Sequence, residues 1–495
     1  MRLLCVFLVL SCALAGAAER RLITETDLYR FQWIGGPQMS PDGSSVAFAK
    51  VKVNEKHTDY ESSLYLVSTS GGEPRRLTNG TRDSSPTWSP DGKMLAFLRA
   101  IEKDGKPQPP QIYLLPMNGG EARALTELPK GASNPVWSPD GKRITFLSGT
   151  LPKDQEKKKE GEEPSDVVVV LTARYRSNGS GYVDRSRPSH IWVIDVAADA
   201  KPKQLTTGSF AETDPAWSAD GSAIYFLSDR KLEPEYDSPD ADVWSVPSNG
   251  GEIKRVVSID GPITSLSLNP SGRQVAFIGF VNKPVRSYSQ SDLFVADLGS
   301  GSVRNLTEKF DEDISGRVGG DNGTPRGGSR EAPFWSRDGR YLFATRGKEG
   351  RENFVRVDTE TSKVEVLVPG DHAVQAWTAD DKASKVALLI STPTQIHDLW
   401  TVDIGKSGLK RLTDVNKHLW SELKLTEPEM IWYPSFDGKK VQAWVQRPPD
   451  FDPNKKYPMI LNIHGGPHSA YGYVFDHEFQ WMAAKGYVVL YPNPR

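Results

Sequence analysis

The amino-acid sequence predicts a mainly β protein: a seven-bladed β-propeller followed by the first part of an α/β domain. Three observations lead to this prediction. A short pattern built around Asp-Gly recurs seven times, a second pattern follows each copy, and the character of the chain changes after residue 426. Repeats that each supply a few short strands are typical of propellers.

The first pattern predicts a β-hairpin in every repeat. Asp-Gly supplies the positive φ angles of a tight turn. In the third copy Ile144 and Phe146 then alternate with other residues at the period of a strand. The copies are MSPDGSSVAF from Met39, WSPDGKMLAF from Trp88, WSPDGKRITF from Trp137, WSADGSAIYF from Trp217, LNPSGRQVAF from Leu268, WSRDGRYLFA from Trp335 and WTADDKASKVALL from Trp377.

The second pattern predicts two further strands in each repeat. LYLVSTSGGEPRRLT and its counterparts indicate a strand, a polar or Gly-containing turn, and a strand that ends in Leu-Thr. A four-stranded antiparallel unit cannot bury its faces alone, but neighbours stacked around an axis can. We therefore expect the propeller to occupy residues 22–426, with a short lead-in at 22–30.

Two repeats carry insertions, at residues 152–166 and 308–330. The first is a run of mixed charge that we expect to be a solvated loop. The tyrosines and arginines that follow it, in ARYRSNGSGYVDRSR, form either a structural loop or a binding surface. The second insertion contains GRVGGDNG. It lacks the Gly-Lys-Ser/Thr ending and the surrounding βα unit of a phosphate loop, so nucleotide binding is not expected.

Composition and the first residues limit the partners and the location of the protein. Lys plus Arg (61) nearly balance Asp plus Glu (63), which does not favour nucleic acid or an anionic membrane as a partner. Residues 1–18 are apolar and end in Ala15-Gly16-Ala17, as in a cleaved secretory signal. An uncleaved anchor and lipidation at Cys12 are the alternatives. We expect a secreted or periplasmic protein without other membrane segments. Because both cysteines, Cys5 and Cys12, lie in the signal, we expect no disulfides in the mature protein.

After the seventh repeat the pattern becomes that of an α/β domain. Strands on both sides of Asp437-Gly438 indicate a hairpin, and PMILNIHGG begins as an apolar strand. HEFQWMAAKG indicates a helix that ends at Gly486, and YVVLYPNP a buried strand. This order of strand, helix and strand opens an α/β domain over residues 427–495.

The seven repeats followed by this hairpin and by HGGP resemble the prolyl oligopeptidase family of serine peptidases. Within that family, the HGGP sequence resembles the corresponding turn of the acylaminoacyl-peptidase branch, which includes secreted dipeptidyl peptidases. The resemblance covers the chain from about residue 22 and implies a propeller before an α/β-hydrolase domain. It also implies peptide substrates, no cofactor, and catalysis by a Ser, an Asp and a His.

The sequence contains no Gly-X-Ser-X-Gly, the turn that carries the nucleophilic serine in α/β-hydrolases. GKSG at 405–408 lacks the final Gly and lies in a propeller repeat. The expectation is therefore a fragment with an incomplete catalytic domain, without the triad and inactive by itself.

HGGP is the candidate site. A backbone N–H aimed at the oxygen of an attacked carbonyl contributes about 3 to 4 kcal/mol, and glycine allows the closest backbone approach. By resemblance, Gly466 or Gly465 is the oxyanion-hole donor, with His464 and Pro467 supporting the loop. The alternative is a purely structural turn.

Other titratable residues near HGGP are given no catalytic role. His464 and His468 are four residues apart, but Gly-Gly-Pro prevents the helix that would place both on one zinc ion, so no metal is expected. Asp476 and His477 are expected to be surface residues.

Two classes of function remain. The first is a serine peptidase that cleaves short peptides, with the propeller as a filter against folded proteins. The second is a non-catalytic periplasmic scaffold that is similar to TolB-type propellers and binds protein partners. The sequence leaves the oligomeric state and the residue preference open.

Overall fold

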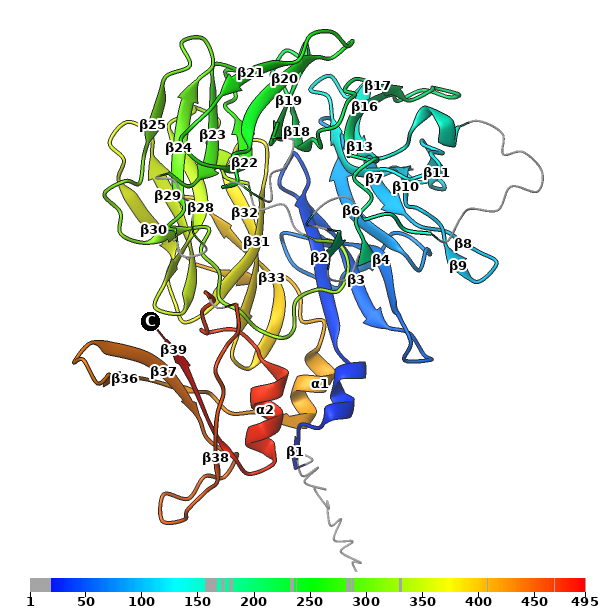
Figure 1. Ribbon diagram of the computed structural model, residues 1–495. Helices are drawn as coiled ribbons and strands as arrows, with labels where there is room; N and C mark the ends of the chain where they lie inside the picture. The colour runs from blue at the N-terminus through cyan, green and yellow to red at the C-terminus, as the bar shows by residue number, and fades with distance from the viewer. Residues whose placement is uncertain are drawn as a thin grey trace, which may run out of the picture.

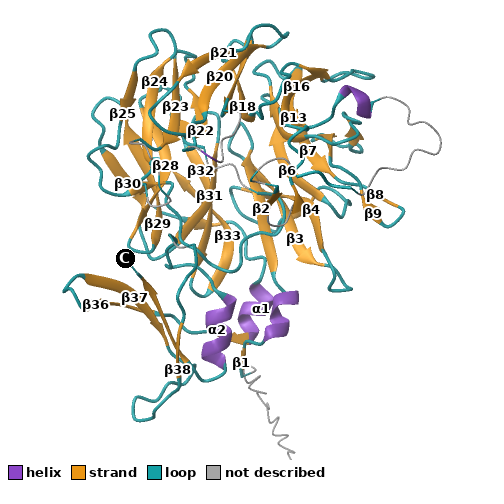
Figure 2. Ribbon diagram, viewed as in Figure 1, coloured by secondary structure: helices purple, strands orange, loops and turns teal. Residues whose placement is uncertain are grey.

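The computed structural model describes residues 19–155, 167–170, 173, 175–177, 181–231, 236, 238–281, 286, 289–328, 332–406, 408–466 and 468–494. The predicted signal (1–18), most of the charged insertion (156–166) and Pro467 lie outside these residues. The protein is mainly β (Figures 1 and 2). Within the described residues, none of the helices has the length and apolarity that a bilayer crossing requires.

Five repeats each form a four-stranded antiparallel sheet, as predicted. In chain order the strands are β2 (Gln32–Met39), β3 (Ser45–Val53), β4 (Tyr60–Ser68) and β5 (Arg75–Arg76); β6 (Asp83–Trp88), β7 (Met94–Arg99), β10 (Gln111–Pro116) and β11 (Arg123–Ala124); β12 (Ser133–Trp137), β13 (Arg143–Ser148), β16 (His190–Asp195) and β17 (Lys203–Gln204); β18 (Thr213–Trp217), β19 (Ala223–Ser228), β20 (Asp242–Pro247) and β21 (Lys254–Val257); and β22 (Ile263–Leu268), β23 (Gln274–Gly279), β24 (Asp292–Asp297) and β25 (Val303–Asn305).

The last two repeats share one nine-stranded sheet. A single parallel pair, Glu352 with Ala373, joins its two halves. The strands are β26 (Asp313–Ile314), β27 (Phe334–Trp335), β28 (Tyr341–Lys348), β29 (Arg351–Asp358), β30 (Val364–Val368), β31 (Ala373–Ala379), β32 (Lys385–Thr392), β33 (Gln395–Asp403) and β34 (Lys410–Arg411).

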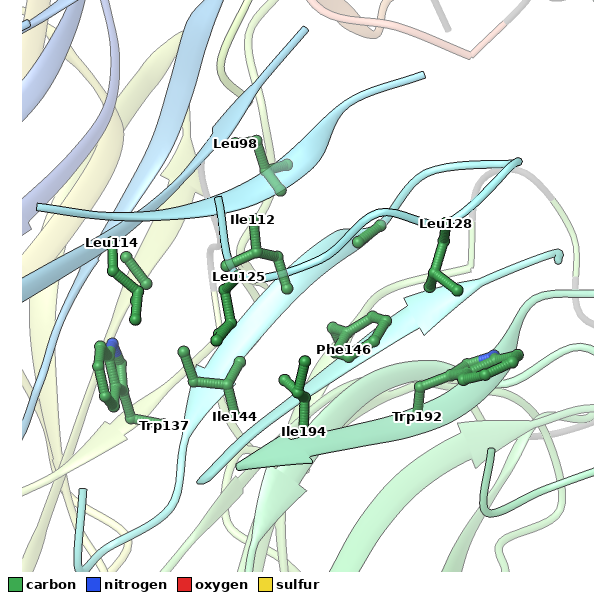
Figure 3. Close-up of a cluster of buried hydrophobic side chains, with 12 residues drawn as sticks. Leu98, Ile112, Leu114, Leu125, Leu128, Trp137, Ile144, Phe146, Trp192 and Ile194 are labelled. Carbon is green, nitrogen blue, oxygen red and sulfur yellow. The ribbon is translucent and has the colours of Figure 1, made fainter. Parts of the chain in front are cut away.

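The sheets follow one another around a ring, so that β2 of the first sheet lies beside β31 and β33 of the last (Figure 1). A buried cluster closes the ring between these sheets and includes Phe48 of β3 and Leu389 of β32. Equivalent clusters lie between consecutive sheets. Figure 3 shows one of them, in which Ile112 of the second sheet faces Ile144 and Phe146 of the third.

Indole side chains add hydrogen bonds between neighbouring sheets. The tryptophan that opens five of the sequence repeats donates its Nε1–H to a carbonyl of the preceding repeat, in or just before the strand that ends at that repeat's own pattern. These bonds are Trp88 to Gln38, Trp137 to Thr87, Trp217 to Val136, Trp335 to Ser267 and Trp377 to Ala332, at 3.0 to 3.2 Å. The aromatic residue of the pattern therefore links sheets, a role that the sequence did not reveal.

Short elements lie outside the main sheets. Two are hairpins, β8 (Glu102–Lys103) with β9 (Lys106–Pro107) and β14 (Arg176–Ser177) with β15 (Gly181–Tyr182). Two are 3-10 helices, at Glu25–Tyr29 and Pro152–Asp154. Helix α1 (Lys417–Glu422) follows the last repeat and leads into β35 (Leu423–Lys424), which pairs in parallel with β1 (Arg21–Leu22). The first and last parts of the ring are thereby tied together.

The C-terminal segment forms the predicted elements. β36 (Glu429–Pro434) and β37 (Lys440–Gln446) form the hairpin around Asp437-Gly438, and the complete sheet has the order β36-β37-β39-β38. β38 (Met459–Leu461) and β39 (Val488–Asn493) are parallel, and α2 (His477–Ala484) connects them. Helix α2 lies between this sheet and α1 in Figure 2. Gly486 has a φ of 91°, as expected where a helix ends.

Candidate functional site

The HGGP loop follows β38 after Asn462 and Ile463. Gly466 has a φ of 132°, and a Cβ atom there would lie 2.9 Å from the His468 backbone nitrogen. Gly465 does not have a left-handed φ, and a Cβ atom on it would have open space. The backbone therefore requires glycine at position 466 but not at position 465. Among the described residues neither amide donates a hydrogen bond, and both residues are exposed.

His464, the first residue of HGGP, contacts Gly465 and Tyr471 of the same loop. Its Nδ1 is 3.1 Å from the Gly465 carbonyl oxygen. The imidazole packs edge-on against the Tyr471 ring, with 5.1 Å between ring centroids. These contacts fit the predicted supporting role of His464. The described residues contain no group of three His, Cys, Asp or Glu side chains that could hold a metal ion.

Three residues that the sequence analysis missed hold the ends of this loop. Tyr471 donates its hydroxyl to Asn462 Oδ1 at 2.5 Å. Its backbone N–H donates to Asn493 Oδ1 at 2.7 Å, and its carbonyl accepts from Asn493 Nδ2 at 3.1 Å. Asn462 follows β38 and Asn493 ends β39. Polar residues at the carboxyl ends of two parallel strands are the sequence signal that would have pointed to them.

His477 is buried and Asp476 is half-buried, so the prediction that both are surface residues was wrong. His477 is 5% exposed, and its Nε2 lies 3.0 Å from the Thr24 carbonyl oxygen. Burial, and after it the nearby Asp321 carboxylate, raise the pKa of Asp476 to about 8. Asp476 also accepts a hydrogen bond from the Phe479 N–H at the start of α2. Both residues are covered by segments that are remote in the sequence, which local pattern does not reveal.

The Gly-rich insertion packs against the start of α2. Asp321 accepts hydrogen bonds from the His477 and Glu478 N–H groups at 2.8 and 2.9 Å. A Cβ atom on Gly320 would lie 2.9 Å from the Phe475 carbonyl oxygen. GRVGGDNG thus binds a helix N-terminus of its own chain, and its glycines permit the close approach.

The first strands of the first four sheets, together with Gly328, line a cavity of about 460 Å³. In each of these four strands a residue with positive φ precedes a proline: Gly36, Ser85, Asn134 and Asp214. At each position the strand has a bulge that turns it toward the cavity. A second cavity, of about 390 Å³, is lined by Trp217, Trp335 and Trp377. Both are too small for a folded protein and large enough for a short peptide.

The chain is similar to known propeller proteins and peptidases. The family model of the TolB beta propeller domain matches residues 24–179. An uncharacterized peptidase of Bacillus subtilis, YuxL, is 31% identical over 481 residues, which are 96% of this chain and 71% of the relative. Dipeptidyl-peptidase 5 of Porphyromonas gingivalis is 26% identical over 494 residues, 92% of this chain and 65% of that protein.

Solved structures show the same fold. Acylaminoacyl peptidase of Pyrococcus horikoshii has a TM-score of 0.71 at 22% identity and covers 96% of this chain, which in turn covers 67% of that protein. The β-propeller domain of the Trilobed protease from Pyrococcus furiosus has a TM-score of 0.53 at 18% identity, over 78% of this chain and 97% of that domain. The chain thus spans about two thirds of the length of full-length relatives.

Proposed function

This chain belongs to the prolyl oligopeptidase family of peptidases, and on that premise we propose that it serves the serine-type hydrolysis of short peptides. The observation that carries the proposal is the loop at Gly466. It follows a parallel strand, requires glycine for its backbone, and leaves the Gly465 and Gly466 N–H groups without a described protein acceptor. Such amides can bind the oxygen that becomes negative when a hydroxyl attacks a peptide carbonyl.

Gly466 is the proposed oxyanion donor, and Gly465 is the second candidate. Because the donor is preorganised, it stabilises the transition state without reorganising during the reaction, a contribution of about 3 to 4 kcal/mol. His464 supports the loop through its contacts with Gly465 and Tyr471. The serine, its base and the second oxyanion donor belong, in this proposal, to a complete α/β-hydrolase domain.

The sheet of the C-terminal segment fits the start of such a domain. β38 is an edge strand of this sheet in the described residues, and it pairs only with β39. Met459 and Leu461, which lie on the same face of β38, are 60% and 51% exposed, and Ile463 just beyond the strand is 63% exposed. Further parallel strands and helices of an α/β-hydrolase would cover these side chains.

The propeller is the proposed size filter. Counting the nine-stranded sheet as two blades, one of β26 to β30 and one of β31 to β34, joined by the Glu352 and Ala373 pair, gives seven blades. Its central cavities of about 460 and 390 Å³ suit a few residues of extended peptide. We further propose that residues 1–18 are a secretory leader and that the protein acts on peptides outside the cytoplasm.

The match to the TolB beta propeller domain supports a second candidate, a scaffold that binds protein partners without catalysis. One experiment separates the two. The coding region beyond codon 495 is sequenced, and the whole reading frame is expressed and treated with short fluorogenic peptides and a fluorophosphonate probe. A peptidase releases the fluorophore and is labelled on serine. A product that neither hydrolyses peptides nor reacts with the probe contradicts the peptidase proposal and favours the scaffold.

Gly466→Ala tests the oxyanion role in the same product. The new Cβ atom would crowd the His468 backbone and displace the N–H, so kcat is expected to fall about 100-fold or more. Gly465→Ala is the matched control, since a Cβ atom there has open space and an allowed φ. Equal kcat values for both variants would assign the loop a structural role.

A further inference from the structure

We propose that Tyr471 is a positioning residue for the HGGP loop and that it acts through a clamp formed with Asn462 and Asn493. This inference rests on the proposed function and adds the residues that hold the oxyanion donor in place. In this clamp the Tyr471 hydroxyl closes residues 462–471 into a ring by its bond to Asn462 Oδ1. Gly465 and Gly466 lie between the two ends of that ring.

The clamp fixes the loop to the ends of two neighbouring strands. The Asn462 N–H donates to the Leu490 carbonyl at 2.9 Å, which anchors the first end of the loop to β39. Asn493, the last residue of β39, binds both backbone groups of Tyr471 and anchors the other end. The Asn493 Nδ2 also lies 3.4 Å from Gln442 Oε1 of β37. Hydrogen bonds therefore connect the ends of the loop to three strands of the sheet.

The surroundings of Tyr471 keep its ring in one place. The ring is 9% exposed and packs edge-on against Phe479 of α2 and Tyr491 of β39, with centroid distances of 5.5 and 5.4 Å. Burial, followed by the carboxylates of Asp476 and Glu478, raises the pKa of Tyr471 to about 12. The hydroxyl stays protonated over the working range of a peptidase. Its acceptor, the Asn462 amide, carries no charge that could titrate.

The loop itself supplies little else to hold the donor. Within the described residues the only hydrogen bond of the glycine pair is that between the Gly465 carbonyl and His464 Nδ1. His464 in turn rests on the Tyr471 ring. Tyr471 therefore both closes the loop through its hydroxyl and supports His464 through its aromatic ring. Without the Tyr471 hydroxyl, Gly465 and Gly466 would sample orientations in which their amides no longer point at one oxygen position.

The first test measures loop order directly on the 495-residue chain. Backbone ¹⁵N order parameters of Gly465 and Gly466 are compared in wild type, Tyr471→Phe and the control Tyr487→Phe, whose ring is 37% exposed next to Gly486. We expect the order parameters of both glycines to fall toward about 0.6 in Tyr471→Phe and to keep their wild-type values in Tyr487→Phe. Asn462→Ala should have the same effect, and the double variant no more than either single one. Unchanged order parameters, or additive effects, would overturn the clamp.

The second test uses kcat of the full reading frame on a short peptide. Loss of one neutral hydrogen bond should lower kcat about 3- to 10-fold with little change in KM, and the loss should be the same from pH 6 to pH 9. A changed KM with unchanged kcat would contradict a positioning role. If wild type hydrolyses no peptide while the loop of Tyr471→Phe loses order, the clamp stands and the proposed function fails. Hydrolysis with identical kcat and loop order in both proteins refutes the clamp alone.

Discussion

The repeated turn shows how a few side chains specify a local structure. In the third repeat Ser138 Oγ donates to Asp140 Oδ1 at 2.6 Å and accepts from the Arg143 N–H at 2.9 Å. The hydrogen bond from Ser138 lowers the pKa of Asp140, so the carboxylate stays charged. Gly141 has a φ of 69°. The seventh repeat has Ala383 in this conformation, with a φ of 49°, so the turn tolerates a side chain at a cost.

Gly141→Ala is expected to lower the free energy of unfolding by about 1 kcal/mol. The new Cβ atom would be 3.6 Å from Pro90, an ordinary contact, so the cost comes from the left-handed backbone alone. Gly323→Ala is the control, because Gly323 has neither a left-handed φ nor a neighbour within 4 Å of the added Cβ. Urea unfolding measures both. Equal stabilities would show that the turn relaxes without strain.

At the scale of elements, each sheet depends on its neighbours for burial. The cluster in Figure 3 is shared by the second and third sheets, and Trp137 contributes both apolar surface and the bond to the Thr87 carbonyl. The fifth repeat has Leu268 and the first has Met39 at the tryptophan position. Neither can donate the indole bond, so the sheets are not joined with equal strength.

Trp137→Phe should destabilise the protein by about 1 to 2 kcal/mol, since the Thr87 carbonyl loses its indole donor while most of the apolar contact remains. Trp432→Phe, on the exposed face of β36, should change the stability by less than about 0.5 kcal/mol. Thermal unfolding at a fixed pH distinguishes the two. If both variants lost the same amount of stability, the indole hydrogen bond would not contribute to the association of the sheets.

At the scale of the molecule, the insertion of the sixth repeat and the N-terminal segment hold the C-terminal segment against the propeller. Asp321 and Asp476 meet at the start of α2 with Glu478, Tyr471 and Tyr491 around them. The charged groups with the largest effect on Asp476 are acidic. The contact is therefore most stable when Asp476 is protonated.

The stability of this contact should depend on pH. Because the folded protein holds a proton on Asp476 up to about pH 8 while the unfolded chain releases it near the ordinary pKa of 3.8, the contribution of this proton to the stability is fully present below about pH 4. It declines as the pH rises toward 8, by at most about 1.4 kcal/mol per unit. Asp476→Asn keeps an acceptor for Phe479 and should flatten the decline of the unfolding midpoint between pH 5 and 8.

Asp452→Asn serves as the control for this pH profile. Asp452 lies in a partly exposed turn, where it accepts a hydrogen bond from the Asn454 N–H. Its variant should follow the wild-type profile. An Asp476→Asn protein with the wild-type slope would show that the carboxyl pair does not hold the proton.

The sequence determined what depends on neighbours along the chain. Asp-Gly turns, alternating strands, the hairpin at Asp437-Gly438 and helix α2 follow from residues within a few positions of each other, and all were predicted. The sequence did not distinguish Gly465 from Gly466, whereas the backbone requires glycine only at position 466. The donor role of either residue remains a prediction. Only the tertiary structure decided what surrounds that loop. Asn493 reaches Tyr471, Asp321 caps α2 and Thr24 covers His477 across separations of 22, 156 and 453 residues. The periodicity of a sequence does not encode such contacts, because the folding of the whole chain brings these residues together.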